Sequence, residues 1–223
     1  MPPKSAKTIR VLLADDHPIV RAGIREALKE LPGVEVVGEA HDGRVAIEMA
    51  NSLHPDVVFM DVSMPDLNGL EATERIVKAF PQMRVIILSR HENEEYYWDA
   101  LRKGASGYLL KKAAIAELKS ALHRVAGGEI YLSREISTRL RDQLPLHRIA
   151  HGRTPIEQLT ARQREVLQLI AEGQTTKAIA LKLKVSPKTV EYHRMRLMEC
   201  LNIFDIPRLV CFAAKNRLIS VES

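Results

Sequence analysis

Between residues 9 and 127 the sequence alternates five short apolar runs with five longer amphipathic ones. The apolar runs have the length and composition of buried strands, and the amphipathic runs have helical periodicity. This alternation favours a doubly wound parallel sheet, because parallel neighbours need a helical crossover between them. We predict strands at 9–14, 34–40, 56–61, 84–88 and 106–110, and helices near 18–30, 43–53, 69–80, 94–103 and 114–127.

Acidic side chains end two of these predicted strands. Asp15 and Asp16 follow the first strand, and Asp61 ends the third. Open parallel sheets bind ligands at the carboxyl ends of their strands, so the three carboxylates are expected to meet at one site. Like charges in one cleft raise each other's pKa unless a cation is present. Oxygen ligands suit a hard divalent ion, and the sequence therefore predicts a Mg2+ site.

The charge of the chain is unevenly distributed. Residues 1–150 hold 21 Lys and Arg against 21 Asp and Glu, whereas residues 151–223 hold 12 against 7. The whole net charge of +5 therefore lies in the last third of the chain. A basic surface favours a polyanionic partner such as nucleic acid, with a solvated basic face as the alternative.

Composition excludes several other classes of protein. No stretch approaches the roughly 18 uncharged apolar residues of a membrane span. Residues 1–7 lack the apolar segment of a secretory signal. We therefore expect a cytoplasmic protein without a membrane partner. Cys200 and Cys211 match no metal-ligand spacing and are expected to be reduced thiols.

The rear third is predicted to be helical throughout. Beyond Gly127-Gly128 we expect a linker helix over 133–140, with Ser133 as its cap. Residues 143–157 lack sustained periodicity and read as a hinge. After the hinge, helices are expected near 161–171, 175–183, 187–200 and 207–217.

The second and third of these helices have the cap and turn residues that are typical of a helix-turn-helix. Gly173 suits the end of the preceding helix, and Thr175 or Thr176 can cap the next one. A tight turn at Lys184-Val185 leads to Ser186-Pro187, a cap followed by proline at the first helical position. The second helix of such a pair can occupy the major groove of DNA.

That second helix has one apolar and one polar side. Val190, Leu197 and Leu201 are expected to face the core. The candidates for contact with base edges are Lys188, Glu191, Tyr192 and Met195. The candidates for contact with phosphates are Thr189, His193, Arg194, Arg196 and, on the preceding helix, Lys177. The open alternative is a small helical protein-binding module with scattered cations.

Two sets of motifs together carry a family resemblance. The front half has Asp15-Asp16, Asp61 with Met64-Pro65 behind it, Ser89 after the strand 84–88, and Gly107-Tyr108-Leu109-Leu110-Lys111. The rear has Leu159-Thr160-Ala161-Arg162-Gln163-Arg164-Glu165-Val166-Leu167, Ala171-Glu172-Gly173, Lys177-Ala178-Ile179-Ala180 and Ser186-Pro187-Lys188-Thr189-Val190-Glu191-Tyr192-His193. With these motifs the chain resembles a response regulator of the NarL/FixJ type.

The resemblance implies an organisation for the whole chain. A disordered lead at 1–8 precedes a flavodoxin-like receiver domain at 9–128 with strand order 2-1-3-4-5. A linker at 129–157 then joins it to an all-α, four-helix, LuxR-type helix-turn-helix domain at 158–223.

The resemblance also implies roles for residues of the front half. Asp61 would accept a phosphoryl group from a histidine kinase. Mg2+ would be bound by Asp16, by Asp61 and by the main-chain carbonyl of Ser63, with Asp15 assisting through water. Lys111 would pair with the phosphoryl group, Ser89 would hydrogen-bond it, and Tyr108 would change rotamer as Ser89 moves.

The implied partners are a histidine kinase, double-stranded promoter DNA and, after phosphorylation, a second copy of the chain. The receiver face that changes would involve the fourth and fifth helices or the first and fifth. The last helix could supply a dimer contact, although its apolar residues could equally serve the core alone: Leu209, Val210, Phe212 and Ala213. Four departures from the family pattern are Lys184 and Asn202 in place of glycine, Cys200 in place of lysine, and an acidic Glu191.

Two rival functions remain beside this one. A small Mg2+-dependent phosphatase of the haloacid dehalogenase type would place a second Asp where Ser63 stands, so a turnover enzyme is not expected. A phosphorylation-independent regulator would not need the complete set of acids with Ser89 and Lys111. Metalloprotease chemistry is unsupported, because no second histidine follows His91-Glu92 at the required spacing.

Overall fold

The computed structural model describes residues 8–92, 94–143, 155–216 and 218–219. The chain forms two compact units, the first from most of the residues up to 146 and the second mainly from residues 147 onward. Each unit contains a hydrophobic core of its own. Residues 1–7 of the lead expected at 1–8 and residues 144–154 of the hinge expected at 143–157 lie outside the described residues.

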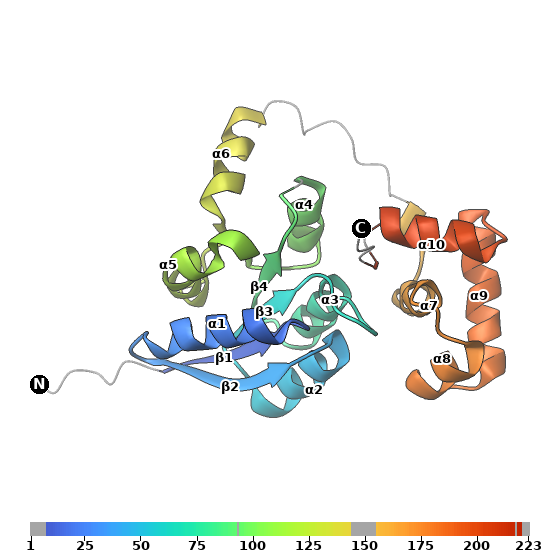
Figure 1. Cartoon of the computed structure of the whole chain (residues 1–223), viewed down its shortest axis with the longest axis horizontal. Helices are drawn as coiled ribbons and strands as arrows, with labels where there is room; N and C mark the ends of the chain where they lie inside the picture. The colour runs from blue at the N-terminus through green and yellow to red at the C-terminus, as the bar shows by residue number, and fades with distance from the viewer. Residues whose placement is uncertain (1–7, 93, 144–154, 217, 220–223) are drawn as a thin grey trace, which may run out of the picture. The chain divides into compact units, whose positions relative to one another are not determined.

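The first unit is built on a six-stranded parallel sheet in the order β2-β1-β3-β4-β5-β6 (Figure 1). The first five strands confirm the predicted order 2-1-3-4-5 and lie within one or two residues of the predicted ranges. Their bounds are β1 Ile9–Ala14, β2 Val34–Ala40, β3 Val57–Asp61, β4 Arg84–Ser89, β5 Gly107–Leu110 and β6 Tyr131–Leu132.

Helices cover both faces of this sheet. On one face Ile24 of α1 and Leu118 of α5 share a core with Val11 and Phe59 of the strands. On the other face α2, α3 and α4 pack against the sheet, and Tyr97 of α4 makes an edge contact with the ring of Tyr108. The bounds are α1 Pro18–Lys29, α2 Gly43–Leu53, α3 Gly69–Ala79, α4 Glu94–Arg102, η1 Lys111–Ala113 and α5 Ala114–Ala126.

The prediction of five strands is wrong by one, because the chain adds a sixth strand after α5. The amide of Tyr131 donates to the carbonyl of Ser106, and the amide of Ser133 donates to that of Tyr108. Two residues are too few for a periodic pattern, so this edge strand has no sequence signature. The linker helix is α6, Arg134–Gln143. The hydroxyl of Ser133 donates to Glu117, whose carboxylate also accepts from the amide of Arg134.

The second unit is helical, as predicted for the rear of the chain. It consists of η2 Pro155–Gln158, α7 Ala161–Ala171, α8 Thr176–Lys182, α9 Pro187–Leu201 and α10 Ile206–Lys215. A capping box between Thr160 and Gln163 starts α7. Within the described residues, no helix combines the length and the hydropathy that crossing a membrane requires.

Candidate functional site

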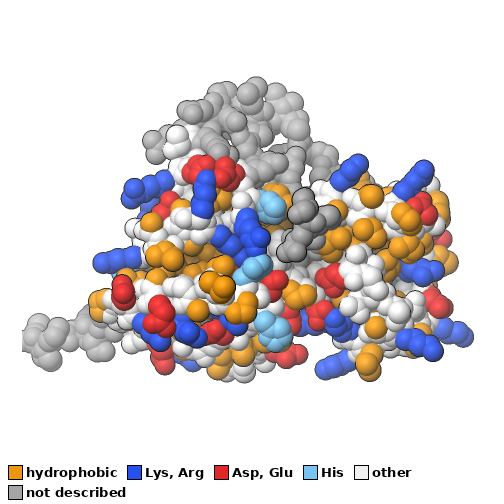
Figure 2. Space-filling view, in the orientation of Figure 1, with side chains coloured by type: hydrophobic (Ala, Val, Ile, Leu, Met, Phe, Trp, Pro, Cys, Tyr) orange, Lys and Arg blue, Asp and Glu red, His pale blue; other side chains and the backbone are white. Residues whose placement is uncertain are grey.

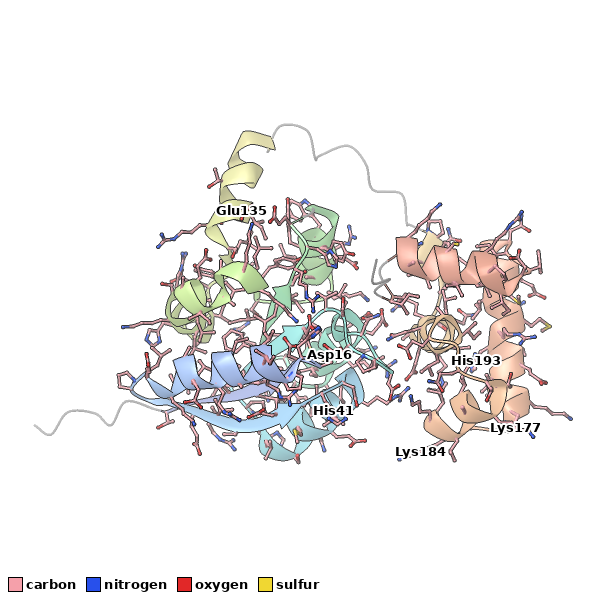
Figure 3. The ribbon with its side chains drawn as sticks, viewed as in Figure 1. Asp16, His41, Glu135, Lys177, Lys184 and His193 are labelled. Atoms are coloured by element: carbon pink, nitrogen blue, oxygen red, sulfur yellow. The ribbon has the colours of Figure 1, made fainter. Side chains whose placement is uncertain are left out.

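The three predicted carboxylates come together at the carboxyl edge of the sheet. Parallel pairing of β1 with β3 brings Asp15, Asp16 and Asp61 to adjacent strand ends. His17 joins them, and one ligand atom from each of the four residues lies within 4.8 Å of the others. Asp15 and Asp61 are buried, whereas Asp16, which is labelled in Figure 3, is partly exposed. Clustered carboxylate oxygens are the donor set that a hard divalent cation prefers.

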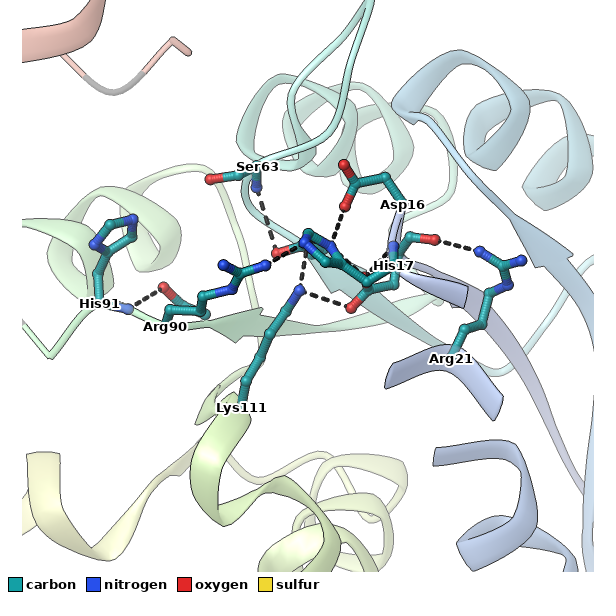
Figure 4. A network of polar contacts seen from close by, with 10 residues as sticks. Asp16, His17, Arg21, Ser63, Arg90, His91 and Lys111 are labelled. Atoms are coloured by element: carbon teal, nitrogen blue, oxygen red, sulfur yellow. Dashed lines mark hydrogen bonds and ion pairs between the residues drawn. The ribbon is translucent and has the colours of Figure 1, made fainter. Parts of the chain in front are cut away.

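A buried ammonium group partly balances these acids. The Nζ atom of Lys111, just after β5, lies 2.6 Å from Oδ2 of Asp61 and 2.8 Å from Oδ2 of Asp15 (Figure 4). Burial raises the pKa of the Asp61 carboxyl to about 6, because desolvation disfavours its charged form. The ammonium of Lys111 lowers this pKa, and the charges of Asp15 and Asp16 raise it further. The site therefore carries more negative charge than Lys111 alone can neutralise.

The loop after Asp61 is closely packed against the start of α3. The amide of Gly69 donates to the carbonyl of Val62, and a Cβ atom at position 69 would lie 1.8 Å from the carbonyl oxygen of Asp61. Only glycine therefore fits at this helix start. The amide of Ser63 points back to Oδ1 of Asp61 at 3.4 Å (Figure 4). This packing keeps the backbone of Ser63 beside the acids.

Ser89 and Tyr108 are linked through the backbone of His91. The hydroxyl oxygen of Ser89, at the end of β4, accepts from the amide of His91 at 3.0 Å. The buried Tyr108 donates from its hydroxyl to the carbonyl of His91 at 2.9 Å. The loop that follows β4 therefore connects Ser89 with Tyr108.

Two residues of this site were not among the sequence-based candidates. The Nδ1 atom of His17 lies 2.5 Å from Oδ1 of Asp16, and the guanidinium of Arg90 contacts Nε2 of the same ring (Figure 4). A sequence signal for both exists: His17 directly follows the acidic pair, and Arg90 directly follows Ser89. Arg90 immediately follows β4, and His17 lies three residues beyond the end of β1.

The second unit contains the predicted helix-turn-helix in α8 and α9. Gly173 has a φ of +79°, and the hydroxyl of Thr175 accepts from the amide of Ala178 at the start of α8. The turn places Lys184 in the left-handed region at φ +54°. Ser186 then caps α9 by accepting from the amide of Thr189 at 3.1 Å. These contacts confirm the predicted helix boundaries.

The predicted nucleic-acid contacts lie on the solvent side of α8 and α9. Val190 and Leu197 are buried in the core, as predicted, and Leu201 packs beside them. Lys177, Lys188, Glu191, Tyr192, Arg194, Met195 and Arg196 are exposed, and Thr189 and His193 are half-buried. Figure 3 labels Lys177 and His193 on this unit, and Figure 2 shows Lys and Arg side chains distributed over its helices.

Four of these candidates already contact other side chains of the chain. Arg196 donates to Glu199 at 2.8 Å, and the hydroxyl of Thr189 lies 2.8 Å from that of Ser186. The ring of Tyr192 stands edge-on to that of His193. The surface of α9 is therefore partly preorganised.

Family comparisons agree with both units. The family of the response regulator receiver domain matches residues 11–123, and that of the bacterial regulatory proteins of the luxR family matches residues 157–213. The chain is a two-component response regulator of the NarL/FixJ family. It is a DNA-binding transcription regulator whose activity depends on phosphorylation.

Curated relatives resemble the regulator over nearly its whole length. The oxygen regulatory protein NreC of Staphylococcus carnosus is 39% identical, over 95% of this chain and 99% of its own. The nitrate/nitrite response regulator NarL of Escherichia coli is 38% identical, over 85% of this chain and 87% of its own. The response regulator UvrY of Escherichia coli is 37% identical, over 96% of this chain and 98% of its own.

Solved structures of response regulators have the same fold. The RcsB response regulator of Salmonella typhimurium is 30% identical, over 94% of this chain and 100% of its own, with a TM-score of 0.58. The RcsB chain in a complex with DNA is 29% identical, over 93% of this chain and 98% of its own, with a TM-score of 0.58. These relatives are DNA-binding regulators, which agrees with the expectation that the chain is not a turnover enzyme.

Proposed function

We propose that Asp61 is the side chain that accepts the phosphoryl group, and that the donor is a phosphohistidine of a histidine kinase. The observation that carries this proposal is the position of Asp61, buried beside two other carboxylates and 2.6 Å from the ammonium of Lys111. Asp16, Asp61 and the main-chain carbonyl of Ser63 would hold Mg2+, with Asp15 acting through water. The bound ion would supply the positive charge that the cluster of acids lacks.

The chemistry requires positioning and charge neutralisation more than covalent assistance. An oxygen of the Asp61 carboxylate forms the new bond to phosphorus, and the bond from phosphorus to the donor breaks with its electron pair staying on the donor. The ammonium of Lys111 is already within contact distance of Asp61 and can bind a phosphoryl oxygen. Water reverses the modification slowly by attacking phosphorus, which returns the free carboxylate.

The response to phosphorylation begins at Ser89. Its hydroxyl proton is available to a phosphoryl oxygen, and its oxygen is bonded to the amide of His91. As Ser89 moves toward Asp61, it opens space for Tyr108, and the loop after β4, whose His91 carbonyl accepts from the Tyr108 hydroxyl, follows. Tyr108 then changes rotamer, and the surface near α4 changes with it.

In the second unit, α9 enters the major groove of promoter DNA and the chain acts as a homodimer that binds two half-sites. In a related structure two RcsB dimers are bound to two parallel DNAs, which supports this arrangement. Exposed Lys188, Glu191, Tyr192 and Met195 contact base edges. Phosphates are bound by Lys177, Thr189, His193, Arg194 and Arg196. On α10, Leu209 and Ala213 belong to the core, so a dimer contact there would use the remaining surface.

The phosphoacceptor is tested by intact mass spectrometry after incubation with acetyl phosphate and Mg2+. The wild-type chain is expected to gain one phosphoryl group, and Asp61→Asn is expected to gain none. The surface variant Asp99→Asn is the matched control and should be labelled like the wild type. Undiminished labelling of Asp61→Asn would place the acceptor elsewhere.

The DNA interface is tested by fluorescence anisotropy with a promoter duplex over a range of salt concentrations. Arg194→Ala and Lys177→Ala are each expected to weaken binding and to reduce the salt slope by about one, because each removes one phosphate contact. Lys119→Ala, at an exposed position on α5, is the control. Unchanged affinity and slope in both test variants would contradict the proposed docking.

A further inference from the structure

The contact between Arg90 and His17 passes directly over the end of β3. Arg90 follows β4 and His17 follows β1, and these two strands flank β3 in the sheet. Neighbouring strands lie about 4.8 Å apart, so a contact between residues of β1 and β4 spans about 10 Å across the strand between them. That strand ends at Asp61. His17 Nδ1 is 3.9 Å from Oδ2 of Asp61, which confirms that the bridge covers the carboxylate.

The hydrogen-bonding types fix the direction of this bridge. A guanidinium can only donate, so Nε2 of His17 accepts from Arg90. On the other side of the ring, Nδ1 lies 2.5 Å from Oδ1 of Asp16. The backbone amide of His17 donates to Oδ1 of Asp15 at 2.8 Å, which restrains the backbone of His17 beside the acids. His17 therefore occupies a carboxylate oxygen that a metal ion at Asp16 would use.

A count of formal charges shows what the phosphorylated site lacks. Three carboxylates, the ammonium of Lys111 and one divalent cation sum to zero. Phosphorylation replaces the single charge of Asp61 by a group carrying about two negative charges, so about one is left uncompensated. The guanidinium of Arg90 lies over this position and carries one positive charge. Its planar donor pair also matches phosphoryl oxygens better than an ammonium does.

We propose that Arg90 is an additional phosphoryl-binding residue of this regulator, held over Asp61 by His17 until a divalent cation takes the Asp16 oxygen and releases both side chains. The inference rests on the proposed role of Asp61. In the released state Arg90 donates to phosphoryl oxygens from the solvent side, opposite Lys111. Arg90 thus binds the phosphoryl group directly.

The test uses the full chain and beryllofluoride as a non-covalent phosphoryl mimic. Binding is followed at saturating Mg2+ by the 19F NMR signal of the bound mimic. Arg90→Ala is expected to bind beryllofluoride about tenfold more weakly, since a charge-assisted bidentate contact is lost. The affinity of Arg90→Lys for beryllofluoride is expected to lie between those of the wild type and Arg90→Ala. Arg102→Ala, another exposed arginine of the same unit, is the matched control and should bind like the wild type.

A second measurement separates the two parts of the bridge. In calorimetry His17→Ala is expected to bind Mg2+ several-fold more tightly than the wild type. The reason is that Oδ1 of Asp16 no longer has to lose its contact with His17 before it binds the ion. Arg90→Ala should bind Mg2+ at least as tightly as the wild type, because a nearby positive charge is gone. Circular dichroism checks that each variant is folded.

Three outcomes would overturn the inference. They are wild-type affinity of Arg90→Ala for beryllofluoride, a loss of Mg2+ affinity in Arg90→Ala, and weaker Mg2+ binding by His17→Ala. A failure of the proposed function looks different: the wild-type chain itself would then bind no beryllofluoride, and Asp61→Asn would still be phosphorylated.

Discussion

At the scale of single residues, the most consequential group is the carboxyl of Asp61. It combines burial, two neighbouring acids and one ammonium partner, and its pKa is raised to about 6. The same features that prepare it to receive a phosphoryl group make its charged form costly in the folded metal-free protein. Function and stability are therefore opposed at this position.

We predict that Asp61→Asn stabilises the metal-free first unit at high pH. The folded pKa is raised above the unfolded value of 3.8. Stability is therefore fully retained below about pH 4 and is lost as the pH rises through about 6, by up to about 3 kcal/mol. Asparagine is never ionised and avoids this loss.

Urea unfolding in EDTA between pH 3.5 and 8 measures the effect. The variant should be more stable than the wild type at pH 8, and the two should converge below pH 4. Added Mg2+ should narrow the gap at pH 8. A wild-type protein that is equally stable at both ends of this range would contradict the prediction.

Lys184 is a second residue whose conformation has a cost. It occupies the left-handed region at φ +54° in the turn between α8 and α9. Lys184→Gly is expected to stabilise the second unit by roughly 0.5–1 kcal/mol, because the steric strain of about 1–2 kcal/mol exceeds the entropy cost of glycine. The control Arg194→Gly, at an exposed helical position, should destabilise it by about 1 kcal/mol. Chemical denaturation of the full chain measures the change in unfolding free energy for both variants. Changes of the same sign would be inconsistent with strain at Lys184.

At the scale of elements, the approach of α3 to the end of β3 determines the geometry of the acceptor loop. Gly69 permits this approach, and the side chain of Asn68 caps the helix by accepting from the amide of Glu71 at 2.9 Å. The helix start and the phosphoacceptor strand therefore form one packed corner. A change in this corner should affect phosphorylation even though no catalytic group is altered.

We predict that Gly69→Ala destabilises the first unit by about 3 kcal/mol, because the new Cβ would overlap the backbone of Asp61. Labelling by acetyl phosphate should fall in parallel. Gly23→Ala is the matched control: its Cβ would meet only Ile115 at 3.9 Å, and alanine favours the helix α1. The control should be neutral or slightly stabilising, and a Gly69→Ala protein as stable as the control would show that the corner can relax.

At the scale of the whole molecule, the hydrophobic core that the sheet forms with α1 and α5 shares no residue with the core of the second unit. The first is built from the sheet with α1 and α5, and the second from α7 to α10 and the segments beside them. Each core should therefore unfold in its own cooperative transition. The stabilising effect of a ligand should likewise be confined to the unit that binds it.

We expect two transitions in calorimetry of the full chain, of which Mg2+ raises only that of the first unit. Phe59→Ala should lower only that transition and Leu197→Ala only the other, each by about 3–4 kcal/mol of unfolding free energy. Both residues are fully buried, which makes them a matched pair. A single transition that both variants shift equally would mean that the two units unfold together.

The sequence alone determined the features that depend on neighbouring residues. The alternation of apolar and amphipathic runs predicted five of the six strands and the helices of both units. Caps such as Ser186 and breaks such as Gly173 were readable because a cap or a left-handed residue acts within one turn of itself. The acids at two strand ends could be assigned to one site because parallel strands share a carboxyl edge.

Tertiary structure decided what depends on residues far apart in the sequence. The pairing of β6 has no periodicity of its own, and the position of Glu117 beneath the start of α6 depends on how α5 packs. The bridge from Arg90 to His17 exists because the strand order places β1 and β4 on either side of β3. Such contacts follow from the neighbours that the fold selects across the sheet, and local sequence carries no record of that selection.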